Sequence, residues 1–208
     1  MRAAHPLGLA LGLFLLIITI GLLQPTGLFA PIDEFLMRVA QWMHGIRGAG
    51  LVTQVAVWLD RLGAAGGRVM IALAIGMMLA TSGRPDLMIR LFLAAMGTSV
   101  VNSLIKLAFD APRPMSLGSI IETTGTSFPS GHAAGAMALY GALAMMTGSR
   151  ILILACAAMI LGTGMSRVWL GVHWPSDVFG GWAVGLMWLA ILAWLMPPVR
   201  LASDRRAR

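Results

Sequence analysis

Three short polar clusters interrupt an otherwise apolar sequence, and each contains residue types that handle phosphate groups or protons. Each cluster lies beside an apolar run, which predicts polar side chains at helix ends. The clusters are Lys106 with Arg113 and Pro114, then Pro129-Ser130-Gly131-His132, and then the stretch from Ser166 to Asp177. The sequence therefore predicts one polar site assembled from several helix ends.

The second cluster leads directly into the apolar run 133–146 and so begins a predicted helix. The N-terminus of a helix carries unpaired N–H groups and the positive end of the helix dipole, so it attracts anions. His132 in the first turn adds a proton donor or acceptor at the same place. Alone, this pattern predicts only a helix start that binds an anion.

The other two clusters contribute three cations, Lys106, Arg113 and Arg167. A cation near a membrane boundary is costly unless it reaches water or meets an anion. Each of these side chains, taken alone, is explained by snorkelling to the interface. Together at one helix N-terminus they match a phosphate group, whose oxygens accept guanidinium and ammonium hydrogen bonds.

His173 and Asp177 are four residues apart at the start of a further predicted helix. The carboxylate could accept the proton of one ring nitrogen and leave the other nitrogen basic, which activates a histidine as a base or nucleophile. The alternative is that Asp177 only caps the helix and His173 is a polar residue at the membrane interface.

The composition places the chain in the membrane class. Of its 208 residues 58% are hydrophobic and 11% are charged, whereas a soluble domain carries charge on roughly a quarter of its residues. The net charge of +7 would suggest nucleic acid in a soluble protein. Here we assign it to arginines at membrane boundaries, and we expect no nucleic-acid partner.

The lone Cys156 is expected to be a small buried apolar residue. No carboxylate cluster indicates a metal, since Asp33-Glu34 is an isolated pair, and we expect no cofactor.

The apolar runs predict an all-α integral membrane bundle of six transmembrane helices in a single domain, residues 1–208. The predicted spans are about 7–23, 67–81, 87–109, 131–147, 150–169 and 177–196. The first run could instead be a signal peptide, but Leu28 and Pro31 fit a cleavage site poorly. Between the first two spans, 32–62 has the spacing of amphipathic interfacial helices. We predict a break at 63–67, and we assign the charge in 32–62 to a solvated face without a catalytic role.

Six spans place both termini on one side of the membrane. The positive-inside rule makes that side cytoplasmic, because it carries the arginines Arg2, Arg84, Arg150, Arg200, Arg205, Arg206 and Arg208. Four arginines fall on the other side, in a long amphipathic connection where the rule is weaker: Arg38, Arg47, Arg61 and Arg68. Connections 24–66, 110–130 and 170–176 then share the outer side, so all three polar clusters are predicted to meet there.

These clusters resemble the three signature motifs of the type 2 phosphatidic acid phosphatases. This family of membrane lipid phosphate phosphatases is related to soluble acid phosphatases and vanadium haloperoxidases. The matching residues are Lys106-x6-Arg113-Pro114, Pro129-Ser130-Gly131-His132 and Ser166-Arg167-x5-His173-x3-Asp177. The motifs occupy residues 106–177, and the six-span layout is similar over the remainder.

The resemblance implies a role for each matching residue. His173 would be the nucleophile that forms a phosphohistidine, Asp177 would orient it, and His132 would be the general acid. The implied phosphate-binding residues are Lys106, Arg113, Ser130, Gly131 and Arg167, with Pro114, Pro129 and Ser166 in support. The implied activity is metal-independent hydrolysis of a lipid phosphomonoester or diphosphate in the cell membrane. Substrates known for the family include phosphatidic acid, phosphatidylglycerophosphate, undecaprenyl diphosphate and phosphorylated lipid A.

Two other functions fit parts of the pattern. A lipid phosphotransferase would use the same residues but pass the phosphoryl group to another lipid. A non-catalytic lipid or anion transporter would place its binding groups near the membrane midplane and show repeat symmetry. The polar groups here lie at helix ends and the sequence has no evident repeat, which favours an enzyme.

Overall fold

The computed structural model describes residues 5–114 and 119–196, and within these ranges its regular elements are all helical, which confirms the all-α fold class. The elements in chain order are α1 (His5–Leu23), the short η1 (Gln24–Thr26), α2 (Ala30–His44), α3 (Ala49–Gly63), α4 (Ala65–Thr81), α5 (Pro85–Lys106), α6 (Gly131–Met146), α7 (Arg150–Trp169) and α8 (Pro175–Leu195). Arg2, Pro197-Pro198 and the basic tail lie outside the described residues.

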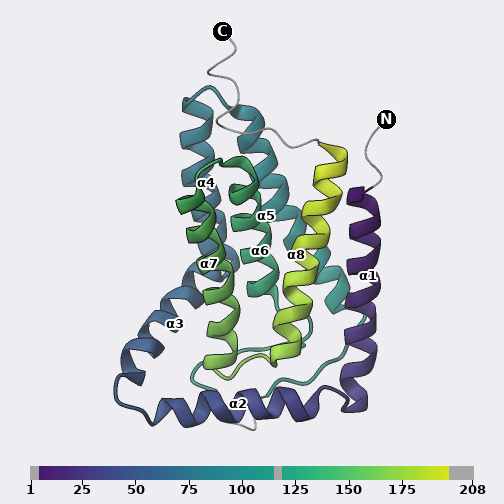
Figure 1. The fold of residues 1–208 in the computed structure, drawn as a ribbon, viewed down its shortest axis with the longest axis vertical. Helices are drawn as coiled ribbons and strands as arrows, with labels where there is room; N and C mark the ends of the chain where they lie inside the picture. Colours follow the sequence, from purple (N-terminus) through teal and green to yellow (C-terminus); the bar gives the residue numbers. More distant parts are fainter. Residues whose placement is uncertain (1–4, 115–118, 197–208) are drawn as a thin grey trace.

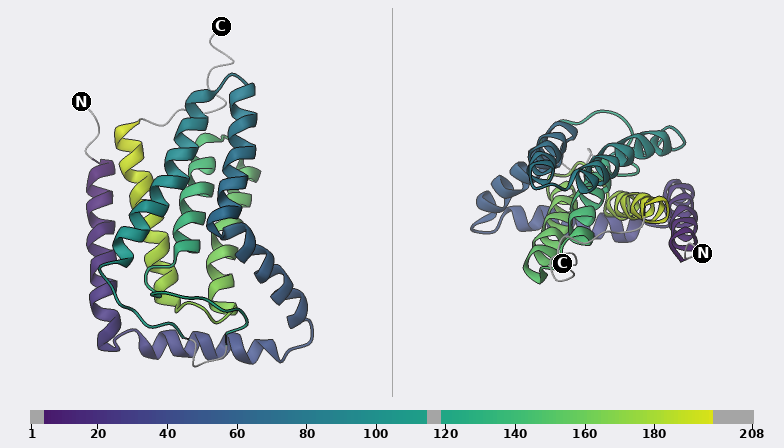
Figure 2. Two further views of the ribbon diagram at one scale, coloured as in Figure 1. Left: turned by 180° about the vertical axis from the view of Figure 1, so that it is seen from behind. Right: turned by 90° about the horizontal axis from the view of Figure 1, so that it is seen from above.

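Helix α6 lies in the middle of the bundle and packs against α5, α7 and α8, while α1 packs against α8 and α4 against α5 (Figure 1). The view from above shows α1 at one edge, beside α8 (Figure 2). A central position suits α6, because its small residues allow neighbouring helices to approach closely. Its buried positions include five alanines and a glycine.

Two glycines of α8 let it lie directly against the backbone of α6. A Cβ atom at Gly181 would lie 2.4 Å from the carbonyl oxygen of Ser130, and one at Gly185 would lie 2.5 Å from that of Ala134. Any larger side chain would separate the two helices. The Gly-x3-Gly spacing therefore serves helix contact inside one bundle.

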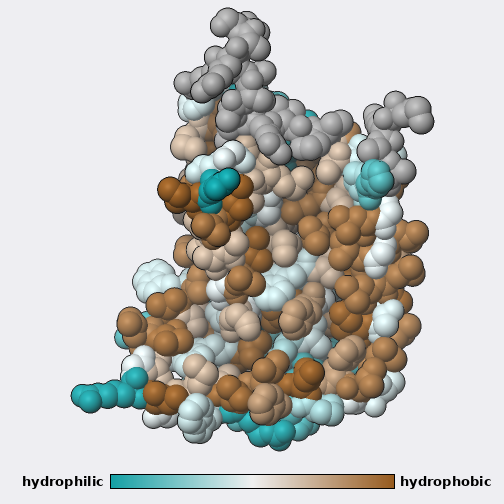
Figure 3. Space-filling model, viewed as in Figure 1, coloured by the Kyte–Doolittle hydropathy of each residue, from teal (hydrophilic) through white to brown (hydrophobic). Residues whose placement is uncertain are grey.

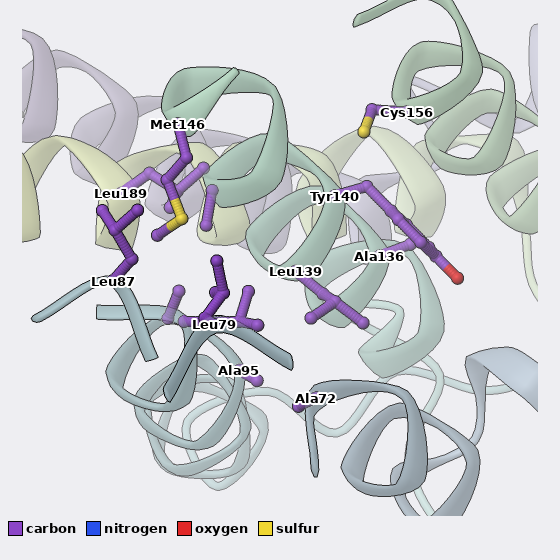
Figure 4. Packing of buried hydrophobic residues seen from close by; sticks show 13 residues of the cluster. Ala72, Leu79, Leu87, Ala95, Ala136, Leu139, Tyr140, Met146, Cys156 and Leu189 are labelled. Carbon is purple, nitrogen blue, oxygen red and sulfur yellow. The ribbon is translucent and has the colours of Figure 1, made fainter. Parts of the chain in front are cut away.

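The half of the bundle away from the polar clusters has an apolar core. It joins α4, α5, α6, α7 and α8 through buried side chains that include Leu79, Leu87, Leu139, Cys156 and Leu189 (Figure 4). The thiol of Cys156 is free and buried among them, as the sequence predicts.

The face of the bundle seen in Figure 3 is mostly hydrophobic, with its most hydrophilic residues near the two ends. Among the described residues, four helices are long and apolar enough to cross a membrane: His5–Thr26, α5, α7 and α8. The α3–α4 pair satisfies the same test as a unit, which gives up to five. The six-span count stays a prediction, since the 16 residues of α6 extend only about 24 Å, less than the ~30 Å hydrocarbon core.

Helices α3 and α4 join at a sharper bend than the sequence predicts. The glycine-rich stretch 63–67 is not an open break, because only Ala64 interrupts the helices, and their axes differ by 70°. The Arg68 guanidinium donates a hydrogen bond to the carbonyl of Gly63 at this bend. As a result α3 runs obliquely along the bundle and packs against α7 (Figure 1).

The start of α1 and the end of α8 lie at one end of the bundle, and α2 crosses the opposite end (Figure 1). The connection after α5 and the turn between α7 and α8 lie at the same end as α2 (Figure 2). The three predicted polar clusters therefore meet at one end of the molecule.

Candidate active site

The polar site begins where the N-termini of α6 and α8 lie side by side. Ser130 is the N-cap of α6, and its Oγ accepts a hydrogen bond from the N–H of Ala133 at 3.5 Å. The N–H of Ser130 in turn donates to the carbonyl of Asp177 at 3.0 Å. A cis peptide bond joins Phe128 to Pro129 just before this cap. Ser130 and Gly131 thus lie directly beside the first turn of α8.

His173 and Asp177 form a buried pair at the start of α8. The Nδ1 atom of His173 lies 3.3 Å from Oδ2 of Asp177, and the two residues are 3% and 0% exposed. The same Oδ2 accepts hydrogen bonds from the backbone N–H of Trp174 at 2.8 Å and from the hydroxyl of Ser127. Several donors therefore hold the carboxylate in place, and it in turn orients the imidazole ring.

Arg113 lies on the other side of the imidazole. Its Nη1 is 3.3 Å from Nε2 of His173. A guanidinium has only donors, so Nε2 must be the acceptor and the ring proton must lie on Nδ1, shared with Asp177. Burial lowers the pKa of His173 to about 4, so the ring is neutral at pH 7. Nε2 therefore carries no proton, and its lone pair accepts a hydrogen bond from the guanidinium.

Lys106 and Arg113 both bind the chain segment that precedes α6. The Lys106 ammonium donates to the carbonyls of Thr126 and Ser127 at 2.8 and 3.2 Å. Besides His173, the Arg113 guanidinium donates to the carbonyls of Thr124, Gly125, Thr126 and Val172. All five N–H groups of Arg113 thus have protein acceptors. The Lys106 ammonium has three N–H groups and hydrogen-bonds two carbonyls among the described residues. A phosphoryl oxygen could replace Nε2 of His173 as the acceptor on Arg113.

Arg167 is the most deeply buried cation of the site, at 1% exposed. Its Nη1 donates to Oδ1 of Asp60, and its Nε is buried without a hydrogen-bond partner among the described residues. A buried donor without a partner is costly, and an anionic ligand would satisfy it. The carbonyl of Arg167 also accepts hydrogen bonds from the N–H groups of Val172 and His173, at 3.1 and 3.4 Å. Arg167 therefore lies beside the nucleophile candidate.

His132 extends from the first turn of α6 towards α3. Its Nε2 lies 3.2 Å from the backbone carbonyl oxygen of Asp60 and 3.2 Å from the Oδ1 atom of the same residue. The structure thus places His132, Arg167 and Asp60 in one cluster, next to the cluster of Lys106, Arg113, His173 and Asp177.

The predicted supporting residues have local contacts. Pro114 is buried. The Oγ of Ser166 donates to the carbonyl of Thr163, one turn earlier in α7, at 2.7 Å. Ser166 therefore hydrogen-bonds within its own helix.

A polar network behind Asp177 connects the start of α8 to α2 and to the end of α1. Asp33 of α2 is 3% exposed and accepts hydrogen bonds from the N–H and the hydroxyl of Ser176, at 2.9 and 2.6 Å. Burial raises the pKa of Asp33. The side-chain amide of Gln24 donates to Ser176 Oγ at 3.1 Å and to Asp177 Oδ1 at 2.9 Å. Gln24 of η1 thus holds Asp177 directly, and Asp33 of α2 holds the neighbouring Ser176.

The prediction that the charge in 32–62 forms a solvated face is wrong for two carboxylates. Asp33 and Asp60 both turn inwards to the site, because α2 and α3 each press one face against the bundle. The helical spacing carries the signal: Ala56, Asp60 and Gly63 share one face of α3, just as Asp33 and Met37 share one face of α2. No spacing in the sequence indicated that Ser127 and Gln24 would contact Asp177.

The chain is similar in sequence to a superfamily of phosphatases and to several bacterial lipid phosphatases. A family model described as the PAP2 superfamily matches residues 87–200. Undecaprenyl-diphosphatase BcrC of Bacillus subtilis is 36% identical over 92 residues, which are 42% of this chain and 47% of that protein. Phosphatidylglycerophosphatase B of the same organism is 29% identical over 107 residues, 47% of this chain and 52% of that protein. The chain thus spans about half the length of these two relatives.

A third relative and a solved structure extend the comparison. Lipid A 1-phosphatase of Rhizobium johnstonii is 42% identical over 67 residues, 32% of this chain and 26% of that protein. The crystal structure of a transmembrane PAP2 type phosphatidylglycerolphosphate phosphatase from Bacillus subtilis superposes with a TM-score of 0.77 at 23% identity. The superposition covers 88% of this chain and 93% of that one, which shows that the two share a fold.

Proposed function

Because the chain belongs to the PAP2 superfamily, we propose that it is a metal-independent membrane phosphatase that hydrolyses a lipid phosphomonoester or diphosphate. It is a membrane-embedded helical protein related to bacterial membrane phosphatases. The observation that carries the proposal is the state of His173: a buried neutral imidazole held by Asp177 through Nδ1, with the Nε2 lone pair 3.3 Å from a guanidinium nitrogen. A phosphate bound to that guanidinium would lie next to the nucleophile.

The first step transfers the phosphoryl group to the enzyme. Nε2 of His173 attacks phosphorus, the bond from phosphorus to the leaving oxygen breaks, and the electron pair leaves with that oxygen. His132 protonates the leaving oxygen. Lys106, Arg113 and Arg167 neutralise the charge on the non-bridging oxygens, which is the main requirement of phosphoryl transfer. The N-terminus of α6, with the N–H of Gly131, adds its dipole to these charges.

The second step returns the enzyme to its starting state. Water attacks the phosphorus of the phosphohistidine while His132, now neutral, accepts a proton from it. The N–P bond breaks and its electron pair returns to Nε2. Asp177 stabilises the Nδ1 proton throughout. Three fixed cations supply the positive charge that other phosphatases obtain from metal ions, which supports metal independence.

The activities named for the relatives support a lipid substrate. They describe proteins that act on undecaprenyl diphosphate, phosphatidylglycerophosphate and lipid A, which share a phosphate headgroup on an apolar body. The site lies at one end of an apolar bundle, so such a headgroup could reach it from the membrane surface. We place the protein in the cytoplasmic membrane with both termini inside and the site on the outer face.

A phosphotransferase would form the same phosphohistidine but transfer the group to a second lipid, and a transporter would form no covalent intermediate. Purified protein in detergent is incubated with phosphatidic acid or undecaprenyl diphosphate without added metal, and released phosphate is measured. We expect release from at least one lipid. Labelling of an acceptor lipid without phosphate release would indicate a transferase instead.

The nucleophile is tested by His173→Ala, with His5→Ala as control because His5 is exposed at the far end of α1. We expect His173→Ala to abolish turnover and to eliminate the acid-labile phosphoryl-enzyme that rapid quenching of wild type should trap. Full turnover by His173→Ala would exclude the phosphohistidine mechanism. Lipid or anion flux that survives this substitution would indicate a transporter.

A further inference from the structure

The general-acid candidate has a carboxylate partner that the signature motifs do not include. Asp60, near the end of α3, presents two oxygens to one nitrogen of His132: its backbone carbonyl and its Oδ1 each lie 3.2 Å from Nε2. A backbone carbonyl can only accept a hydrogen bond. Nε2 must therefore carry a proton in this arrangement.

The orientation of the ring identifies its other nitrogen as the reactive one. A Cβ atom at Gly63 would lie 3.0 Å from Cδ2 of His132, so the edge formed by Cδ2 and Nε2 faces α3. Nδ1 is attached to the opposite side of Cγ and therefore lies on the edge turned away from α3. With Nε2–H held by Asp60, Nδ1–H is the proton that the ring can give to a substrate.

The charges around His132 also require this carboxylate. Two cations lie near His132. Arg167 on α7 shares the carboxylate of Asp60 with it, and the Arg68 guanidinium on α4 donates to the carbonyls of Gly63 and Gly131 beside it. Within the described residues, Asp60 on α3 is the carboxylate that contacts the His132 ring. An imidazolium between two arginines needs a balancing negative charge, since like charges in a partly buried site repel strongly.

We propose that Asp60 is a positioning residue that holds His132 through Nε2 as an imidazolium, with Nδ1–H directed to the leaving oxygen. This inference rests on the proposed phosphatase function. In the first step the Nδ1 proton passes to the leaving oxygen as the phosphorus–oxygen bond breaks, and the neutral ring keeps its Nε2–H on Asp60. In the second step a proton from water returns to Nδ1. Asp60 thereby orients the general acid His132 through Nε2, whereas Asp177 orients the nucleophile His173 through Nδ1.

The test uses the dependence of the rate on the leaving group. An alkyl phosphate such as phosphatidic acid needs a proton on its leaving oxygen, whereas the nitrophenolate of 4-nitrophenyl phosphate leaves without one. We expect Asp60→Asn to lower kcat/KM roughly 10- to 100-fold for phosphatidic acid, part of the ~10²–10⁴ that general acid catalysis contributes. For the nitrophenyl ester we expect a loss of less than about threefold, because its leaving group makes little use of general acid catalysis.

Three further measurements distinguish positioning from folding. The pH at which activity declines on the basic side should fall by about one unit in Asp60→Asn, because an amide does not balance the imidazolium. Asp60→Glu restores a carboxylate at a shifted position. It should recover part of the kcat/KM for phosphatidic acid, relative to that for the nitrophenyl ester, that Asp60→Asn loses. Asp86→Asn, the same chemical change in an exposed ion pair with Arg84 at the opposite end of the bundle, should behave as wild type.

The outcomes separate this inference from the proposed function. If wild type hydrolyses neither ester nor any lipid phosphate, the phosphatase proposal fails, and this inference with it. If wild type is active and Asp60→Asn slows both esters equally, or leaves the pH profile unchanged, only the role of Asp60 is overturned. Should Asp60→Asn not fold, Asp60→Glu decides alone. The glutamate keeps the negative charge but moves it by one methylene. A ratio of kcat/KM for the two esters equal to that of wild type would therefore refute a positioning role for Asp60.

Discussion

Gly181 lies where α8 crosses the first turn of α6, so a single methyl group there should separate the two halves of the site. In Gly181→Ala the new Cβ would lie 2.4 Å from the carbonyl oxygen of Ser130 and 2.9 Å from Cβ of Ala133. Ordinary contact begins near 3.4 Å, so the two backbones must move apart by about 1 Å. The obstacle is backbone, which cannot rotate away, so the helices themselves must move.

The displacement acts on the distance between the acid and the nucleophile. His132 follows Ser130 by two residues on α6, whereas Asp177 lies one turn before Gly181 on α8. A misplacement of about 1 Å in a catalytic constellation reduces the rate by roughly 10²-fold. The overpacked contact should also destabilise the protein by about 1–3 kcal/mol. We therefore expect kcat/KM for lipid phosphate to fall about 100-fold with a moderate decrease of the melting temperature in detergent.

Two alanine variants serve as matched controls. Gly141→Ala also places a methyl between α6 and α8, but against the end of the Leu189 side chain at 2.6 Å and in the half away from the site. It should lower stability and leave kcat/KM near wild type. Gly12→Ala in α1 meets nothing within 4 Å and should change neither. Wild-type activity in Gly181→Ala, or an equal loss of activity in Gly141→Ala, would refute the argument.

Two other predictions follow from the buried groups near α8. Because burial lowers the pKa of His173 to about 4, the nucleophile stays neutral on acidification. The acid limb of kcat/KM, corrected for substrate ionisation, should therefore lie near pH 4, and a limb near pH 6.5 would contradict this. Asp33→Ala leaves the buried N–H of Ser176 without its acceptor and should destabilise the protein by about 1–3 kcal/mol in thermal unfolding. Glu34→Ala, at the neighbouring half-exposed position, should not, and equal melting temperatures for the two variants would exclude this role for Asp33.

The fold class and the family could be predicted because their signals are local. A long apolar run between polar stretches leaves few options other than a helix, and the family motifs depend on residue identity at fixed spacing. The match of residues 87–200 to the PAP2 superfamily confirms the resemblance drawn from the motifs. The arrangement of those motifs at one end of the bundle follows from up-and-down helices, which bring the α5–α6 and α7–α8 connections to the same end.

The bend between α3 and α4 shows where a local signal is too weak. Five residues from Gly63 to Gly67 contain three glycines, which predicts a flexible interruption. The structure uses one residue, Ala64, and satisfies the freed carbonyl of Gly63 with the buried guanidinium of Arg68. That bond joins residues five apart and depends on a cation inside an apolar bundle, so glycine content alone could not have predicted it.

The prediction that Asp60 faces solvent is wrong because a local pattern does not show what surrounds a helix. The same difficulty applies to any amphipathic helix near a membrane. Periodicity identifies which residues share a face, but it does not say whether that face meets water, lipid or protein. On α3 the exposed residues include Leu51, Val55 and Trp58, and Asp60 shares the packed face with Ala56 and Gly63. A surrounding apolar solvent reverses the usual expectation, because large hydrophobic side chains can face lipid while small and charged residues face the protein. A carboxylate between small residues on such a helix therefore indicates a contact with a buried cation, and here that contact joins Arg167 to the general-acid candidate.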